Sequence, residues 1–168
     1  MDKINKNSVA LAGEFAVLSQ LALRGYDANM TLGHTKSVDI LISDPIKGKM
    51  YKLEVKSNFG GKPSRSKLFG YTLNWMMGEK HETISEPNLY YCFVNIEKQT
   101  NIFRFFIVAS EVVAEYVKVQ HKYWLDRKPG LSQKEIDIPM RQFRVGLEDN
   151  YSIPTPLAKD YENKWEFN

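Results

Sequence analysis

Residues 52–57 read KLEVKS, a stretch in which polar and apolar side chains alternate. An alternation with a period of two is typical of a half-buried β-strand. Leu53 and Val55 therefore share one face of the predicted strand, and Glu54 and Lys56 share the other. The Glu-x-Lys spacing also occurs in a polar segment near the C-terminus, so the spacing by itself identifies no site. The surrounding segments decide whether it is a surface salt bridge or part of an active site.

The segments around KLEVKS predict a helix followed by an antiparallel, three-stranded meander. Apolar residues recur with helical spacing over residues 8–25, where Ser8 can cap the start and Gly25 follows the last apolar position. The three strands are separated by Gly-containing turns, the first of them at Gly33-His34. These strands are expected at 26–32, 37–43 and 49–57.

The pattern beyond the meander predicts further helices and strands. After a polar loop we expect a helix at 66–78, strands at 89–96 and 102–108, a helix at 111–127 capped by Ser110, a strand at 141–147 and a short helix after Pro154 or Pro156. This order predicts an α/β (α+β) fold in which a central mixed β-sheet is flanked by helices.

The composition indicates one globular domain. The chain has 168 residues, of which 43% are hydrophobic, so it can bury a core, and no linker or repeat divides it. A net charge of +3 permits a nucleic-acid partner without demanding one. Because Cys92 is the single cysteine, an intrachain disulfide and a thiolate zinc site are excluded. No apolar run approaches the roughly 20 residues that cross a bilayer, so we expect a cytoplasmic protein with no membrane partner.

Glu14 occupies an unusual position on the predicted first helix. On a helical wheel it lies in the middle of an apolar face that is formed by Ala10, Leu11, Val17, Leu18 and Leu21. A buried carboxylate without a partner is destabilising or takes up a proton, so a partner is expected. The structural alternative is a buried ion pair with a lysine or arginine of the core.

Asp39 interrupts an apolar strand in a similar way. Its neighbours Val38 and Ile40 point to one face of the predicted strand, and Asp39 points to the other. One interpretation is a charge that protects an edge strand from aggregation. If this strand and the KLEVKS strand form a hairpin, Asp39 and Glu54 share a face, where they repel unless a cation lies between them. Carboxylate oxygens suit Mg²⁺, and Lys56 reaches the same space, where it can assist a metal-activated water.

Four residues in chain order resemble the motif of the PD-(D/E)XK nuclease superfamily: Glu14, Asp39, Glu54 and Lys56. The resemblance covers about residues 8–108 and implies a restriction-endonuclease-like αβββαβ core. Residues 109–168 would form a C-terminal extension of the same nuclease-like domain, 1–168. The sequence departs from the family name at Val38, which stands where that name has a proline.

The resemblance implies a hydrolase that cleaves phosphodiester bonds with the help of Mg²⁺ or Mn²⁺. Asp39 and Glu54 would be metal ligands, with the backbone carbonyl of Val55 as a third ligand and Glu14 as an accessory one. Lys56 would be the catalytic lysine. The implied partner is DNA in preference to RNA, and a homodimer would supply two cuts on two strands.

Basic residues near this motif are candidates for nucleic-acid binding. No acidic residue occurs after the KLEVKS strand until Glu79, and the interval contains a Gly- and Ser-rich loop with several basic side chains. Lysine and arginine can neutralise phosphates. The candidates come from this loop and from the turn before the second strand: Lys62, Arg65, Lys67, His34 and Lys36.

Two other functions stay open at this point. A catalytically inactive nucleic-acid-binding or protein-interaction module on the same fold would pair Lys56 with Glu54 or Glu14 and would bind no metal. An enzyme of small molecules would instead have a deep apolar pocket away from the carboxylates. The three histidines have no metal-ligand spacing, and none of them, His81 included, is assigned a catalytic role.

Overall fold

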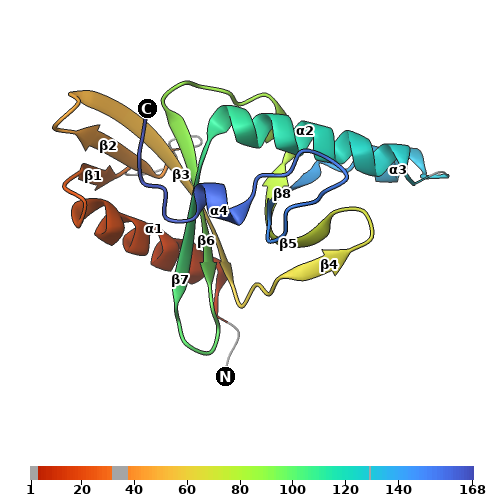
Figure 1. Ribbon diagram of the computed structural model, residues 1–168, viewed down its shortest axis with the longest axis horizontal. Helices are drawn as coiled ribbons and strands as arrows, with labels where there is room; N and C mark the ends of the chain where they lie inside the picture. The colour runs from red at the N-terminus through yellow and green to blue at the C-terminus, as the bar shows by residue number, and fades with distance from the viewer. Residues whose placement is uncertain (1–3, 32–37, 129) are drawn as a thin grey trace.

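The computed structural model describes residues 4–31, 38–128 and 130–168. Its central feature is a five-stranded sheet (Figure 1), in the order β1 (Asp27–Met30), β2 (Ile40–Asp44), β3 (Lys49–Phe59), β6 (Leu89–Ile96) and β7 (Phe103–Ala109). β3 and β6 run parallel, and the other neighbours run antiparallel. The predicted fold class, a central mixed sheet flanked by helices, is therefore confirmed. So is the antiparallel pairing of the KLEVKS strand with the strand before it.

A helix covers each face of this sheet. α1 (Lys6–Ala22) packs on one face through Val17 and Leu21, and α2 (Ser110–Asp126) packs on the other through Val113 and Val117. The central strand β6 is buried along its whole length, because its alternate side chains enter the two cores. None of the described helices has the length and apolar character that a membrane span requires.

The chain after α2 completes both cores. It contains two short helices, α3 (Gln133–Ile136) and α4 (Ala158–Tyr161). Trp165 and Phe167 are buried in the core beside α1. Phe143 enters the other core, where its ring stacks on that of Phe93 with the centroids 4.1 Å apart. The C-terminal extension is thus part of the packed unit.

The helix predicted at 66–78 is wrong, because strands occupy this region. They form a second, three-stranded sheet from β4 (Ser64–Ser66), β5 (Gly70–Gly78) and β8 (Met140–Gly146). β5 leads directly into the 3₁₀ helix η1 (Glu79–Glu82). Between β3 and β6 the chain therefore has a hairpin and η1 in place of the helix in the αβββαβ order.

The burial pattern of β5 explains the difference. Leu73, Trp75 and Met77 are buried in alternation, which is the period of a strand. Gly70 begins the strand with a φ of 64°, a left-handed conformation that does not continue a helix. β5 pairs along its length with β8, which is distant in the sequence, so the local pattern could not show this partner.

The other predicted elements are confirmed with shifted ends. Asn5, not Ser8, caps α1, since its side chain accepts a hydrogen bond from a backbone N–H of the first turn at 2.9 Å. Ser110 does not cap α2. Its hydroxyl instead donates to the carbonyl of Glu86 at 2.9 Å and accepts from the N–H of the same residue at 2.8 Å. The turn predicted between the first two strands lies outside the described residues.

Candidate functional site

The structure brings the four residues of the predicted motif together: Glu14, Asp39, Glu54 and Lys56. Glu54 and Lys56 lie in β3, and Asp39 directly precedes β2. β2 and β3 pair with Ile40 opposite Leu53, so Asp39 comes opposite Glu54. Glu14 comes from α1, which packs on β3, and it is close enough to Asp39 and Lys56 for both to influence its pKa.

The backbone of β3 anchors Asp39. Its Oδ2 accepts a hydrogen bond from the N–H of Val55 at 2.7 Å, and its own N–H donates to the carbonyl of Leu53 at 2.9 Å. On its other side the carbonyl of Asp39 accepts from the N–H of Thr31 at 2.9 Å. Because β2 lies between β1 and β3, the interpretation of Asp39 as an edge-strand charge is wrong.

Glu54 is a buried carboxylate, only 3% exposed. Its Oε1 forms an ion pair with the Nζ of Lys56, and the Nε2 of His81 lies 3.5 Å from the same oxygen. Burial alone would raise the pKa of Glu54. The contacts with His81 and Lys56 outweigh burial and lower this pKa to about 2. Glu54 is therefore ionised at neutral pH, although it is buried.

The pKa values of Asp39 and Glu14 move in the opposite direction. Burial raises the pKa of Asp39. The hydrogen bond from Val55 and the charge of Lys56 oppose this shift, and the charge of Glu54 adds to it. Burial also raises the pKa of Glu14. The charge of Asp39 raises this pKa further, and the charge of Lys56 lowers it. Asp39 and Glu14 therefore lie in surroundings that disfavour their ionised forms, whereas the surroundings of Glu54 favour its ionised form.

The donor chemistry of this cluster fits a hard divalent cation. Mg²⁺ and Mn²⁺ take carboxylate and carbonyl oxygens, and the Oε2 of Glu54 is buried without a hydrogen-bond partner among the described residues. The side chains are not arranged around an ion, however. Within the described ranges, no three His, Cys, Asp or Glu side chains converge as a metal-binding group. Cation binding would use Oε2 of Glu54 while Oε1 stays with Lys56.

Two residues that the sequence did not indicate reach the cluster from η1. His81 is 3% exposed and contacts Glu54, and the charge of Lys80 acts on Asp39, where it favours the ionised carboxylate. No residue spacing reveals these contacts. They depend on the path of β5, which the local pattern predicts as a helix.

The candidate nucleic-acid-binding residues differ in their surroundings. Lys62 and Lys67 are exposed on either side of β4. Arg65 is exposed as well, but its guanidinium binds both carboxylate oxygens of Glu148, at 2.9 and 3.2 Å. Arg65 could bind a phosphate only by giving up this partner. Two candidates lie outside the described residues: His34 and Lys36.

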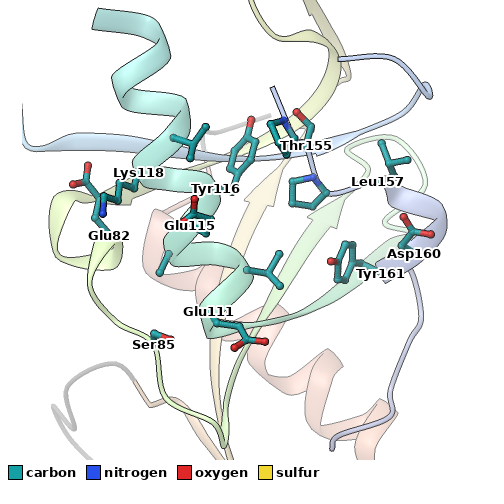
Figure 2. A pocket seen from close by; sticks show the side chains of 15 residues that line it. Glu82, Ser85, Glu111, Glu115, Tyr116, Lys118, Thr155, Leu157, Asp160 and Tyr161 are labelled. Carbon is teal, nitrogen blue, oxygen red and sulfur yellow. The ribbon is translucent and has the colours of Figure 1, made fainter. Parts of the chain in front are cut away.

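A groove of about 860 Å³ lies elsewhere, between α2 and the C-terminal segment that contains α4 (Figure 2). Apolar side chains such as Val112 and Leu157 line it together with the carboxylates of Glu111, Glu115 and Asp160. None of the four motif residues contributes to the lining. The groove is open to solvent, in contrast to the deep apolar pocket expected of a small-molecule enzyme.

Comparisons with known proteins add a likeness of fold. No protein-family model matches the sequence, and no curated protein matches it. Among solved structures, the chain is similar to a bacterial homing endonuclease, I-Ssp6803I, with a TM-score of 0.53 and 13% sequence identity. The similarity covers 97% of this chain and 90% of that chain. The two proteins thus share a fold over almost their whole length, including most of the C-terminal extension.

Proposed function

We propose that this protein is a divalent-metal-dependent nuclease that hydrolyses phosphodiester bonds of DNA with a site of the PD-(D/E)XK type. The observation that carries the proposal is that a helix carboxylate, two carboxylates opposite each other where two strands pair, and a lysine lie near one another: Glu14, Asp39, Glu54 and Lys56. The likeness of the fold to that of a homing endonuclease supports it. Because a fold alone does not establish an activity, these four side chains matter more than the likeness.

The residues have distinct proposed roles. Asp39 and Glu54 would hold Mg²⁺ or Mn²⁺, with the carbonyl of Val55 and the carboxylate of Glu14 as further ligands. When bound, the metal polarises the phosphate and lowers the pKa of a bound water. Lys56 is ion-paired with Glu54, and its side chain is 29% exposed. From this position its ammonium would stabilise the charge that develops on the phosphate or orient the attacking water.

DNA is the proposed substrate class, because the structural neighbour is a homing endonuclease. The segment between β3 and β5 follows directly from the strand that carries Glu54, and its exposed Lys62 and Lys67 would neutralise backbone phosphates. Such contacts position a nucleic acid without reading its sequence. Two copies of the chain would be needed to cut both strands at one place, so we propose a homodimer as the active form.

One observation favours a second candidate, a catalytically inactive nucleic-acid-binding or protein-interaction module. Lys56 is already paired with Glu54, which is the arrangement that this alternative requires. A buried glutamate with a lysine partner can be kept as a structural element with no role in chemistry. The two candidates differ in one property that can be measured directly, which is the affinity for a divalent cation.

Calorimetry distinguishes the candidates. Mn²⁺ is titrated into the wild type, Asp39→Asn and Glu54→Gln, each with and without a short DNA duplex. The nuclease proposal expects the wild type to bind Mn²⁺ and each substitution to weaken binding at least about 10-fold, since each removes a charged ligand. A wild type that binds no Mn²⁺, even with DNA present, would overturn the metal-dependent mechanism and favour the inactive module.

Cleavage assays then test the role of Lys56. Lys52 is a matched control, because it lies on the same strand and face and forms its own ion pair with Glu86 at 2.7 Å. Lys56→Ala should abolish cleavage of DNA while Mn²⁺ binding remains, and Lys52→Ala should cleave as the wild type does. Equal cleavage by both variants would remove Lys56 from the proposed chemistry.

A further inference from the structure

Three buried polar atoms with no hydrogen-bond partner among the described residues lie close together beneath the candidate site. They belong to Glu54 (Oε2), His81 (Nε2) and Tyr91 (hydroxyl), none of which is more than 3% exposed. Glu54 and Tyr91 are neighbours in the pairing of β3 with β6, and the rings of His81 and Tyr91 meet edge to face with their centroids 5.8 Å apart. Buried polar atoms are nearly always paired, so this cluster requires an explanation.

The Tyr91 hydroxyl is held beside the Glu54 carboxylate. Burial raises the pKa of Tyr91, and the charge of Glu54 adds to this shift. The hydroxyl therefore stays protonated and can turn its hydrogen toward the carboxylate. This leaves His81 as the residue whose proton has to be placed.

The second ring nitrogen of His81 limits where that proton lies. Nδ1 is 2.9 Å from the carbonyl oxygen of Gly78 and 3.2 Å from its N–H, so it can donate to the first or accept from the second. If a neutral ring carried its proton on Nδ1, the lone pair of Nε2 would face the carboxylate oxygen of Glu54 at 3.5 Å. Two acceptors at that distance repel. A proton on Nε2 removes the repulsion and gives Glu54 a donor.

We infer that His81 is a positioning residue for Glu54, whose carboxylate it holds through a proton on Nε2. Lys56 binds Oε1 of the same carboxylate, so His81 and Lys56 together restrict its orientation. The purpose of this orientation rests on the proposed function, in which Glu54 is a metal ligand. Side chains that hold a metal ligand in place commonly contribute a factor of about 10–100 to metal affinity.

The competing role for His81 is to hold the turn at η1. Its Nδ1 binds the backbone of Gly78, the residue that precedes η1, and this contact alone could explain a buried histidine. Two substitutions separate the roles. The side-chain amide of asparagine reaches the place of Nδ1, and that of glutamine reaches the place of Nε2. His81→Asn therefore keeps the contact with Gly78, and His81→Gln keeps the donor to Glu54.

The first measurement is the Mn²⁺ affinity of these variants by calorimetry. We expect His81→Asn to bind Mn²⁺ about 10–100-fold more weakly than the wild type and His81→Gln to stay within about threefold. His121→Asn is the matched control, since His121 lies on α2, where its ring stacks on Trp124, and it should bind as the wild type does. Wild-type affinity in His81→Asn, or a greater loss in His81→Gln, would overturn the inference in favour of the turn-holding role.

A second measurement needs neither metal nor activity. Nitrogen NMR of the His81 imidazole in metal-free protein shows whether Nε2 carries a proton. A protonated Nε2 whose resonance shifts in Glu54→Gln supports the inference, and an unprotonated Nε2 overturns it. A different result, a wild type that binds no Mn²⁺, would overturn the proposed function. In that case the imidazole spectrum still decides whether His81 holds Glu54.

Discussion

Replacing Gly13 by alanine tests how α1 presents Glu14 to the site. Gly13 is buried against β3, and a β-carbon at this position would lie 1.8 Å from Oγ and 3.0 Å from Cβ of Ser57. Ser57 can rotate its hydroxyl away, but its Cβ is fixed to the strand. The helix therefore has to move outward by a few tenths of an ångström, and Glu14, the next residue, moves with it.

Two opposing effects determine the size of the change in stability. Alanine is more favourable than glycine in a helix interior by about 1 kcal/mol. Overpacking a close interface typically costs about 1–3 kcal/mol. Because the new carbon would lie 1.8 Å from Oγ of Ser57, we expect overpacking to dominate. Gly13→Ala should lower the free energy of unfolding by about 1 kcal/mol, as measured by urea denaturation.

Two companion variants make this prediction specific. Ala12→Gly changes an exposed position of the same helix and should lower stability by about 1 kcal/mol through helix propensity alone. Ser57→Gly removes both atoms that the new carbon would meet, so the two substitutions at Gly13 and Ser57 should couple by about 1–3 kcal/mol in a double-mutant cycle. A Gly13→Ala protein more stable than the wild type, or a cycle without coupling, would refute the close packing of α1 on β3.

The core and two buried titratable groups give three further predictions. Phe143→Ala should lower the free energy of unfolding, measured in urea, by about 3–5 kcal/mol, because Phe143 is fully buried and stacks on Phe93. A loss of stability below about 1 kcal/mol would contradict this packing. Cys92 should react with thiol reagents only after unfolding, since its complete burial raises the pKa of the thiol; rapid reaction in the folded protein would contradict its placement. Despite burial, His81 and Lys56 lower the pKa of Glu54 from 4.5 to about 2, so its ionised form stabilises the fold above pH 4.5 and this contribution is lost as the pH falls toward 2. In buffer with a chelator, Glu54→Gln should flatten the pH dependence of unfolding in that window, and an unchanged curve would contradict the lowered pKa.

The position of Asp39 opposite Glu54 could be predicted from the sequence. Two alternating strands joined by a short turn can pair in few registers, and a shift by one residue would move every apolar side chain to the wrong face. The observed register, with Ile40 opposite Leu53, keeps both of these residues in the core beside α1. The common face of Asp39, Glu54 and Lys56 follows from this local rule, whereas Glu14 comes from α1.

The environment of Glu54 could not be predicted in the same way. His81 contacts Glu54 because β5 runs as a strand and ends at η1, and β5 is a strand because β8 pairs with it. β8 comes much later in the sequence, so no window of residues around β5 contains the information. Non-local pairing of this kind overrides the local preference that a pattern reports.

The charges beside Lys56 favour the proposed functional site over a purely structural ion pair. One lysine and one buried glutamate are complete as an ion pair, and further carboxylates beside them share the attraction of the lysine and repel one another. Here Asp39 and Glu14 lie next to the pair, and burial together with this repulsion raises the pKa of both. Groups that are kept in such positions at the expense of stability are typical of functional sites.

Asp39→Asn tests this argument, because asparagine keeps the shape of the side chain and an oxygen that can accept from the N–H of Val55, and loses the charge. Without metal, the variant should be more stable than the wild type by about 0.5–2 kcal/mol at neutral pH. Because the folded-state pKa of Asp39 is raised, this difference should disappear below its ordinary value of 3.8, where Asp39 is protonated in both states. Mn²⁺ should raise the thermal midpoint of the wild type and leave that of Asp39→Asn nearly unchanged. If Asp39→Asn without metal were less stable than the wild type, the charge of Asp39 would stabilise the fold. The cluster would then fit the inactive module better than the nuclease.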